Sequence, residues 1–361
     1  MIRLLVVDDS ALVRKLLGQV FAHEADFEVA FARDGLEALD KLKSFAPDVV
    51  TLDVHMPRMD GLACLDRIMI ERPCPVVMVS SLTAEGAEAT LEALKLGAVD
   101  FAPKPGGAVS LHIDDLAPEL VAKVRAAAGA RLRSSLRLTE RVRHRIGRPT
   151  PPTPRKRGSL ADIKPGFEPA TGDGLVLVGT STGGPPALEA LLTPLSADFP
   201  WPILVAQHMP ASFTGPLARR LDGLCTLTVV EVLRPVSPRP GTVYIGRGDA
   251  DLIVTRRAGG LTVTPAPSEP GYPWHPSADR LVRTALEHVA ARQLIGVLMT
   301  GMGNDGAQAM TRLQSLGGHT IAESEETAVV WGMPGELVKA GGADWVVPLP
   351  DIAERLKKLT P

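Results

Sequence analysis

The sequence predicts an α/β protein of two domains, each built on a doubly wound parallel sheet, and three observations lead to this expectation. The chain has 361 residues, which is long for a single hydrophobic core. In both halves short apolar runs alternate with amphipathic segments of helical period, the pattern of repeated strand–helix units. A basic, proline-rich stretch separates the halves. We therefore expect a first domain over residues 1–128, a linker over 129–171 and a second domain over 172–361.

The composition excludes several classes of protein. Hydrophobic residues make up 45% and charged residues 22%, as in ordinary globular proteins, and the net charge of −2 argues against a dedicated nucleic-acid-binding protein. The three cysteines have no metal-type spacing, and their odd number does not suit a disulfide framework. Asp8 and Asp9 come too early for a signal peptide, and no uncharged apolar run could span a membrane. We expect a cytoplasmic protein without a membrane span.

The first domain is expected to contain five parallel strands. These strands are predicted at the apolar runs 3–7, 29–32, 49–52, 76–79 and 100–102. Amphipathic segments such as 11–24 and 36–45 lie between them and predict helices. In parallel sheets of this kind ligands bind beyond the carboxyl ends of the strands, so the residues directly after the strands are candidates for a site.

Three carboxylates and two other polar side chains fall at these strand ends. Asp8 and Asp9 follow the first strand, and Asp53 follows the third. Ser80 comes after the fourth predicted strand, and Lys104 follows the fifth. Clustered carboxylates repel one another unless a cation lies among them, and oxygen-only ligands favour Mg²⁺. A lysine and a hydroxyl directed to the same place suit a phosphoryl group, so Asp53 is the carboxylate positioned to become an acyl phosphate.

The motifs that contain these residues resemble those of two-component receiver domains. The resemblance rests on residues 6–10, 52–61, 79–81 and 104–105. It implies a flavodoxin-like fold in which Asp53 accepts a phosphoryl group from a cognate histidine kinase, while Asp8, Asp9 and Asp53 hold Mg²⁺. The resemblance also implies the phosphoryl contacts and the switch aromatic, which are Ser80, Lys104 and Phe101.

The linker is basic and rich in proline. Between Arg131 and Arg157 there are ten lysine and arginine residues and a single acid, Glu140. Residues 149–154 contain four prolines, cannot be helical and are expected to form an extended tether. A basic run is usually only solvated; an anionic partner, either an acidic receptor surface or membrane headgroups, is the alternative.

The second domain begins with a strand-like segment and a tight turn. Residues 175–178 are all apolar, as in a strand buried on both faces, and a Gly-rich turn with Ser181 near its apex follows. Pro185 and Pro186 suit the first turn of a helix. Ser181 would lie beside unpaired backbone N–H groups and the positive end of a helix dipole, where negative charge is stabilised. Ser181 is therefore a candidate nucleophile.

A serine nucleophile needs a general base and an acid that orients the base. Further strands are predicted at residues 203–206, 241–245 and 295–300. His208 follows the first of these strands and Asp305 follows the last, so both are expected at the same sheet edge as Ser181. His208 would take and return the proton, and Asp305 would fix the tautomer of its ring.

Other histidines and one other type of loop compete with this interpretation. Residues 179–183 also match the G-x-S-x-G elbow of α/β-hydrolases, in which the histidine follows the acid. His319 has that place but lies in an expected loop, and it ranks below His208. His275 is expected to line a substrate cleft, and His288 is expected to be structural. A dinucleotide or phosphate loop is less favoured, because neither G-x-G-x-x-G nor a Walker lysine is present.

The motifs of the second half resemble those of the chemotaxis protein-glutamate methylesterases. The resemblance rests on residues 179–184, 206–210, 275–279, 298–306 and 328–334. It implies a Rossmann-like esterase domain that hydrolyses γ-glutamyl methyl esters on methyl-accepting chemoreceptors, often deamidates glutamines, and needs no cofactor for this chemistry. It assigns the catalytic triad to Ser181, His208 and Asp305, and it places in the oxyanion site or cleft Thr182, Met302 and His275.

The leading hypothesis is an esterase gated by phosphorylation. The first domain would cover Ser181 until phosphorylation of Asp53, transmitted through Ser80 and Phe101, opens the site. Hydrolysis would proceed through an acyl-enzyme or by direct attack of water. A DNA-binding response regulator would instead need a basic recognition helix in the second half, where apolar strands and Gly-rich loops alternate. A scaffold that has lost catalysis would not need an intact triad.

Overall fold

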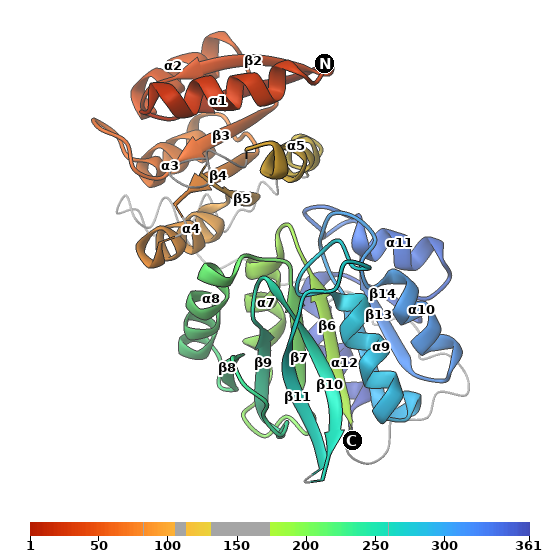
Figure 1. Ribbon diagram of the computed structural model, residues 1–361. Coiled ribbons are helices and arrows are strands. Elements are labelled where there is room, and N and C mark those ends of the chain that lie inside the picture. The colour runs from red at the N-terminus through yellow and green to blue at the C-terminus, as the bar shows by residue number, and fades with distance from the viewer. Residues whose placement is uncertain (82, 105–112, 131–173, 259) are drawn as a thin grey trace, which may run out of the picture.

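The computed structural model describes residues 1–81, 83–104, 113–130, 174–258 and 260–361. The basic run and the tether predicted within 131–173 lie outside these residues. Figure 1 shows two domains, one in red to orange and the other in green to blue. Both are α/β domains with a parallel sheet, as predicted. The boundaries at 128 and 172 stay predictions.

The first domain has a five-stranded parallel sheet in the order β2-β1-β3-β4-β5. The strands are β1 (Ile2–Val7), β2 (Phe27–Ala32), β3 (Val49–Asp53), β4 (Val76–Ser80) and β5 (Asp100–Pro103). Each predicted strand is confirmed, with ends that differ by two residues at most. In register, Val7 lies beside Ala32 on one side and Leu52 on the other, so these strands end at one edge.

Helices cover both faces of this sheet. Buried side chains of α1 (Ala11–Ala22) and α5 (Ile113–Ala128) pack on one face. Those of α2 (Gly35–Ser44), α3 (Gly61–Glu71) and α4 (Ala84–Leu96) pack on the other. Four of the helices begin where the side chain of the preceding residue accepts a hydrogen bond from a first-turn N–H group, and these N-caps are Ser10, Asp34, Asp60 and Thr83.

The second domain has a seven-stranded parallel sheet in the order β14-β13-β12-β6-β7-β9-β8. Its strands are β6 (Leu175–Thr180), β7 (Ile203–Gln207), β8 (Thr228–Val232), β9 (Thr242–Gly246), β12 (Leu294–Leu298), β13 (His319–Glu323) and β14 (Trp345–Val347). The sequence prediction missed β8, β13 and β14, and it extended β12 to Thr300. It also missed an antiparallel pair, β10 (Ala250–Arg257) and β11 (Gly260–Pro267).

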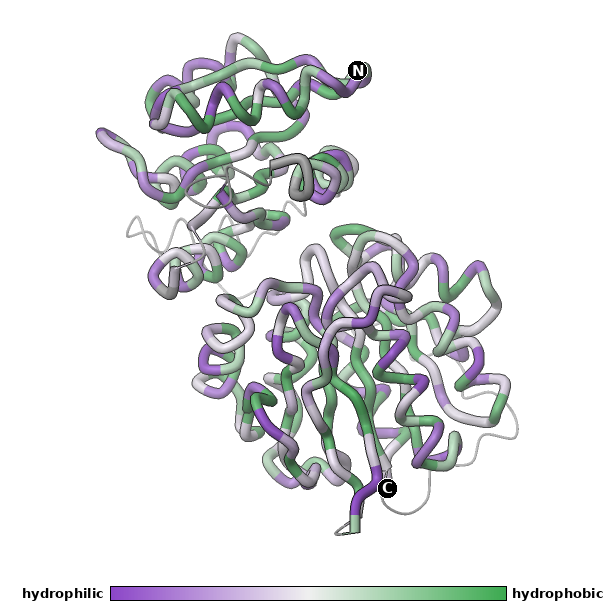
Figure 2. The backbone as a smooth tube through the Cα atoms, in the orientation of Figure 1, coloured by the Kyte–Doolittle hydropathy of each residue, from purple (hydrophilic) through white to green (hydrophobic). Residues whose placement is uncertain are grey.

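Both faces of the second sheet are covered as well. One face carries α7 (Gly184–Leu192), α8 (Ala211–Leu224) and α12 (Leu349–Leu359). The other carries α9 (Ala278–His288), α10 (Ala307–Ser315) and α11 (Met333–Lys339), together with the β10–β11 pair. A short 3-10 helix, Ala291–Gln293, leads into β12. In Figure 2 the central strands are largely hydrophobic, whereas α9 alternates between hydrophilic and hydrophobic residues, as expected for a helix with one buried face.

The strand order brings distant loops together at one edge of the second sheet. β6 pairs with β7 on one side and with β12 on the other. The order of the strands in the sheet therefore reverses at β6. At such a switch point the loops after the two strands diverge and leave a crevice at the carboxyl ends. The loops after β6, β7 and β12 hold the three predicted triad residues.

The first domain is seated over that edge (Figure 1). The ring of Phe101, from β5, lies 4.3 Å from the ring of Phe213 on α8, measured between centroids, and both side chains are buried. At the side of this contact Arg220 of α8 lies 3.4 Å from a carboxylate oxygen of Glu92 on α4. Within the part of the chain that the structure describes, no helix has the length and apolar character needed to cross a membrane.

Candidate active site

Ser181 lies in the turn between β6 and α7. Its backbone N–H donates to the carbonyl of Thr300 at 3.0 Å, and its own carbonyl accepts from the N–H of Gly184 at 2.8 Å. The residue is buried, with 8% of its surface exposed. The turn thus holds the serine between the end of β6 and the amino terminus of α7, as the sequence predicted.

Two glycines are required for this turn. Gly183 has a left-handed backbone with φ of 78°, which is strained for a residue with a side chain. A Cβ atom on Gly184 would lie 1.9 Å from Oε1 of Gln207, where no atom fits. Gln207 in turn donates from Nε2 to the carbonyls of Ser181 at 3.1 Å and His208 at 2.9 Å, so its amide ties the two loops together.

His208 and Asp305 form a close pair at the same edge. Nε2 of His208 lies 2.8 Å from Oδ2 of Asp305. The other ring nitrogen, Nδ1, is buried and has no hydrogen-bond partner among the described residues. The described hydrogen bonds likewise include none between the hydroxyl of Ser181 and His208. The structure therefore gathers the three residues at one edge and pairs two of them directly.

The amino terminus of α9 holds Asp305. The carboxylate accepts hydrogen bonds from the hydroxyl of Ser277 at 2.9 Å and from the N–H groups of Ala278 at 2.6 Å and Asp279 at 3.0 Å. Burial alone raises the pKa of Asp305, but His208 and these N–H groups outweigh that effect and hold the pKa below its usual value. Asp305 is accordingly ionised at neutral pH.

Thr182 and Met302 were expected in the oxyanion site. Among the described residues the backbone N–H groups of Thr182, Gly183 and Met302 form no hydrogen bond. The first two lie at the amino terminus of α7, where the helix dipole is positive. The hydroxyl of Thr182 donates to Oδ2 of Asp100 in the first domain, so the first domain reaches the residue next to Ser181.

The remaining histidines lie apart from the pair. His275 binds Asp251 through Nδ1 at 2.9 Å, in the loop before α9. His288 is the last residue of α9. His319, expected in a loop, is the first residue of β13 and lies level with Ile295, the second residue of β12, toward the edge away from Ser181.

Two residues that support the Ser181 turn were missed in the sequence. The N–H of Thr300 donates to Oε2 of the fully buried Glu323 at 2.8 Å. The hydroxyl of Thr300 donates to the carbonyl of Thr182 at 2.8 Å, while its carbonyl holds the N–H of Ser181. The available signal for Glu323 was a carboxylate directly after Ile321 and Ala322, at the end of a short segment that could form a buried strand, where a charge is rare.

The acidic cluster predicted in the first domain is present. Carboxylate oxygens of Asp8, Asp9 and Asp53 lie within 4.8 Å of one another. Nζ of Lys104 lies 2.8 Å from Asp53 and 3.1 Å from Asp8. Burial, and then the charge of Asp53, raise the pKa of Asp8 to about 6. A divalent cation would relieve this repulsion, so the oxygen-only set fits a Mg²⁺ site.

Ser80 and Phe101 belong to β4 and β5, on the side of the sheet next to β3, but their side chains point away from the cluster. The hydroxyl of Ser80 donates to the carbonyl of Gly86 in α4 at 3.1 Å rather than to a carboxylate of the cluster. Phe101 points to Phe213 of the second domain. In this structure Ser80 therefore contacts α4, and Phe101 takes part in the domain contact.

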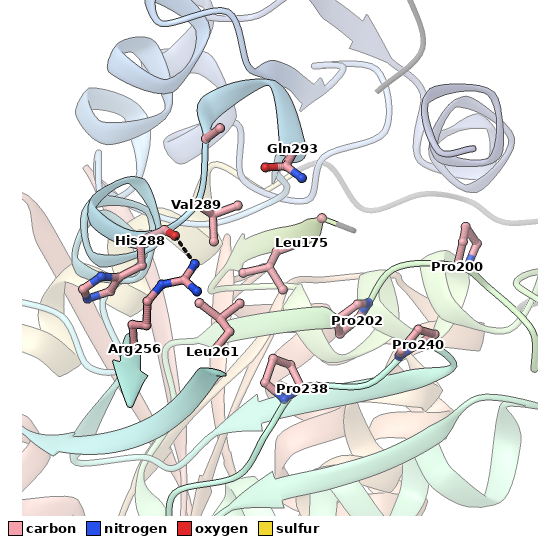
Figure 3. A pocket seen from close by; sticks show the side chains of 12 residues that line it. Leu175, Pro200, Pro202, Pro238, Pro240, Arg256, Leu261, His288, Val289 and Gln293 are labelled. Carbon is pink, nitrogen blue, oxygen red and sulfur yellow. Dashed lines mark hydrogen bonds between the residues drawn. The ribbon is translucent and has the colours of Figure 1, made fainter. Parts of the chain in front are cut away.

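A separate cavity of about 580 Å³ lies at the other end of the second domain (Figure 3). Its walls come from residues before or at the start of β6, β7 and β9, from the β10–β11 pair, and from the end of α9 with the 3-10 helix that follows. Arg256 reaches across it and donates to the carbonyl of His288 at 2.9 Å. None of Ser181, His208 and Asp305 lines this cavity, which therefore does not belong to the candidate site.

Comparison with known families assigns both halves of the chain. Residues 176–356 match the CheB methylesterase family, and residues 4–113 match the response regulator receiver domain. The chain is 60% identical over 355 residues to protein-glutamate methylesterase/protein-glutamine glutaminase 2 of Rhodopseudomonas palustris, covering 98% of this chain and 96% of that protein. It is 51% identical over 363 residues to protein 3 of the same description from Rhodospirillum rubrum, covering 99% of this chain and 95% of that protein.

A solved structure agrees with this assignment. The catalytic domain of the Thermotoga maritima CheB methylesterase is 38% identical, with a TM-score of 0.51, and it covers 53% of this chain and 100% of that domain. The fold, the family matches and the near full-length relatives agree. The chain belongs to the CheB methylesterase family, with a receiver domain in front of its methylesterase domain.

Proposed function

We propose that this protein hydrolyses glutamate methyl esters, and deamidates glutamines, on methyl-accepting chemoreceptors, and that its receiver domain gates the reaction. The relatives named above carry both activities in their names. The observation that carries the proposal is the buried pair of His208 and an ionised Asp305 at the edge where β6 presents Ser181. A cytoplasmic protein would meet its receptor substrate and a histidine kinase in one compartment.

The roles of the triad follow from the hydrogen bonds of His208. With Nε2–H donating to the Asp305 carboxylate, the lone pair of the buried Nδ1 is the free acceptor in the ring. Nδ1 takes the proton of Ser181 as its oxygen attacks the ester carbon, and the resulting imidazolium returns that proton to the departing methoxide. Water then repeats the sequence on the acyl-enzyme, which releases glutamate and regenerates the serine. With glutamine the leaving group is ammonia.

The turn before α7 and the loop after β12 would together stabilise the tetrahedral intermediate. The N–H groups of Thr182 and Met302 are unpaired among the described residues and are the candidate donors to the oxyanion. The glycines of the turn allow this backbone to approach a substrate closely. The N–H of Thr182 would cost no reorganisation during the reaction, because the β6–α7 turn is already held by Thr300 and Gln207.

The receiver would restrain the site through the contact with Thr182. Asp100 accepts a hydrogen bond from this residue, and Phe101 packs on Phe213 only five residues after His208. Phosphorylation of Asp53 by a histidine kinase would draw Ser80 away from α4, and Phe101 would follow. Mg²⁺, when bound, supplies the positive charge that the phosphoryl transfer requires, and Asp8, Asp9 and Asp53 would hold it.

Methanol release from methylated receptors tests the proposal. Ser181→Ala should lower turnover about 10⁴- to 10⁶-fold. Ser315→Ala removes an exposed hydroxyl from α10 of the same domain and serves as the matched control. Acetyl phosphate with Mg²⁺ should raise release by the wild type and leave Asp53→Ala unchanged. Normal release by Ser181→Ala would rule out the triad, and a response by Asp53→Ala would rule out the gate.

A further inference from the structure

An aromatic ring covers the candidate general base. The indole of Trp274 is stacked on the imidazole of His208, with the ring centroids 5.6 Å apart and the planes inclined by 10°. Trp274 is half-buried in the loop before α9, and the side chain of His208 is 7% exposed. One face of the base is thus closed by an aromatic ring that the triad chemistry alone does not require.

The loop that carries Trp274 is anchored on a second buried carboxylate. Asp251 of β10 is 1% exposed and accepts from Nδ1 of His275 at 2.9 Å and from the N–H of Ser277 at 2.7 Å. Arg280 of α9 adds a third bond to Asp251 at 2.6 Å. His275 follows Trp274 directly in sequence and Ser277 lies three residues after it, so Asp251 anchors the chain next to the indole.

The indole also lies next to the loop after β12. A Cβ atom on Gly303 would lie 3.4 Å from Nε1 of Trp274, which is ordinary contact distance. Gly303 belongs to the same loop as Asp305, and Ser277 binds Asp305 directly. The indole therefore lies in a frame built from the elements that hold the triad acid.

We infer that Trp274 is a positioning residue for His208: its indole face keeps the imidazole in the plane in which Nε2 meets Asp305, and it stabilises the imidazolium that forms during proton transfer. The separation of 5.6 Å is within the range of cation–π contacts, and indole is the most effective side chain for them. The inference rests on the proposed role of His208 as the general base. The role of His208 as general base does not by itself require an aromatic side chain at Trp274.

Other titratable groups around the stack come from several elements. Asp305 binds His208 directly. Asp279, a residue of α9, donates its backbone N–H to Asp305, and burial raises the pKa of the Asp279 carboxyl. His275 and Arg280 are both bound to Asp251 of β10. A change at Trp274 leaves all of these groups in place, so a change in the titration of His208 would report on the stack.

The test compares Trp274→Phe, which keeps an aromatic face, with Trp274→Leu, which keeps apolar bulk without one. We expect kcat/KM for methyl ester hydrolysis to fall about two- to thirtyfold in Trp274→Leu and less in Trp274→Phe. Trp345→Phe, on β14, is the matched control and should behave as wild type. Nuclear magnetic resonance of the imidazole nitrogens, assigned with His208→Gln, should show the His208 ring titrating at lower pH in Trp274→Leu.

The outcomes separate this inference from the proposed function. Equal titration of His208 in the wild type and Trp274→Leu, or equal losses of activity in the leucine and phenylalanine variants, would overturn the role of the indole face. A wild type without esterase activity would refute the proposed function, and the ring titration would still decide whether the indole stabilises the charged base.

Discussion

Asp8 and Asp305 each follow a strand at the carboxyl edge of a parallel sheet, and both are buried, with 1% and 5% of their surface exposed. Their pKa values nevertheless move in opposite directions. Burial and the neighbouring Asp53 raise the pKa of Asp8 to about 6. Burial has the same sign at Asp305, but His208 and the N–H groups of α9 overcome it and lower the pKa.

The neighbours of a strand-end carboxylate, rather than its depth, therefore decide its chemistry. Asp8 lies among like charges, so the receiver site favours a cation that neutralises them. Asp305 lies among hydrogen-bond donors, so it remains an anion and can orient a base. The same edge of a parallel sheet thereby holds a carboxylate set that suits a cation in one domain and an ionised carboxylate that suits a histidine in the other.

The largest expected effect comes from removing the charge of Asp305. Asp305→Asn keeps the shape of the side chain, but its amide can donate a hydrogen bond to Nε2 of His208. The ring proton then moves to Nδ1, which can no longer accept the proton of Ser181, and turnover should fall about 10⁴-fold. Methanol release measures this loss. Asp351→Asn, an exposed residue at the start of α12, should retain full activity. An Asp305→Asn enzyme within tenfold of wild type would mean that the acid does not set the tautomer.

A smaller effect is expected at the contact between the two domains. Asp100→Ala removes the acceptor of Thr182, so the unphosphorylated protein should become about 5- to 150-fold more active, the usual range of coupling between sites. Initial rates without acetyl phosphate test this. Asp40→Ala, at an exposed residue of α2 in the same domain, is the control. Unchanged basal activity in Asp100→Ala would show that this hydrogen bond does not restrain the site.

The raised pKa of Asp8 predicts how the stability of the receiver depends on pH and Mg²⁺. An unfolded aspartate titrates near 3.8 and folded Asp8 near 6, so without metal the receiver loses stability as pH rises from about 4 to about 6. Asp8→Asn should therefore gain roughly 1–3 kcal/mol relative to wild type at pH 7.5 and little at pH 4.

Thermal unfolding in EDTA and in Mg²⁺ measures both effects. Mg²⁺ should stabilise the wild type at pH 7.5 and stabilise Asp8→Asn much less, because a carboxylate ligand is missing. Asp40→Asn, an exposed residue of α2, should follow the wild type. Equal stabilisation of wild type and Asp8→Asn by Mg²⁺ would remove Asp8 from the metal site.

The smallest effect is expected for a charge pair at the surface of the domain contact. Arg220 lies 3.4 Å from Glu92, and both side chains are partly exposed. Such pairs contribute about 0–1 kcal/mol and are screened by salt. Arg220→Gln should change the basal rate less than about fivefold and only at low ionic strength. A change comparable with that of Asp100→Ala would contradict the distinction between buried and exposed contacts.

Much of both sites could be predicted because they lie at strand ends. Apolar runs marked the strands, and parallel topology places the residue after each strand at one edge. Asp8, Asp53 and Lys104 in the first domain, and Ser181 and His208 in the second, were found in this way. The edge strand β8 was missed because its side chains alternate between exposed and buried, which gives no continuous apolar run.

The side-chain contacts within the sites could not be predicted in the same way. Ser80 was expected at the acidic cluster, yet its hydroxyl turns to Gly86. The choice of Nε2 as the nitrogen that meets Asp305 depends on the rotamer of His208, which no pattern of residue types encodes.

The amino-acid sequence by itself determined the two α/β domains, the acidic cluster and the edge that carries Ser181, because local periodicity and strand ends are encoded by nearby residues. Only the tertiary structure decided that Asp100 meets Thr182, that Glu323 supports the serine turn through Thr300, and that Trp274 covers His208. The hydrogen bond between Thr182 and Asp100 joins residues 82 positions apart in the sequence, and that between Thr300 and Glu323 joins residues 23 positions apart. Such contacts depend on packing between elements. Their geometry exists only after the sheets and helices have assembled.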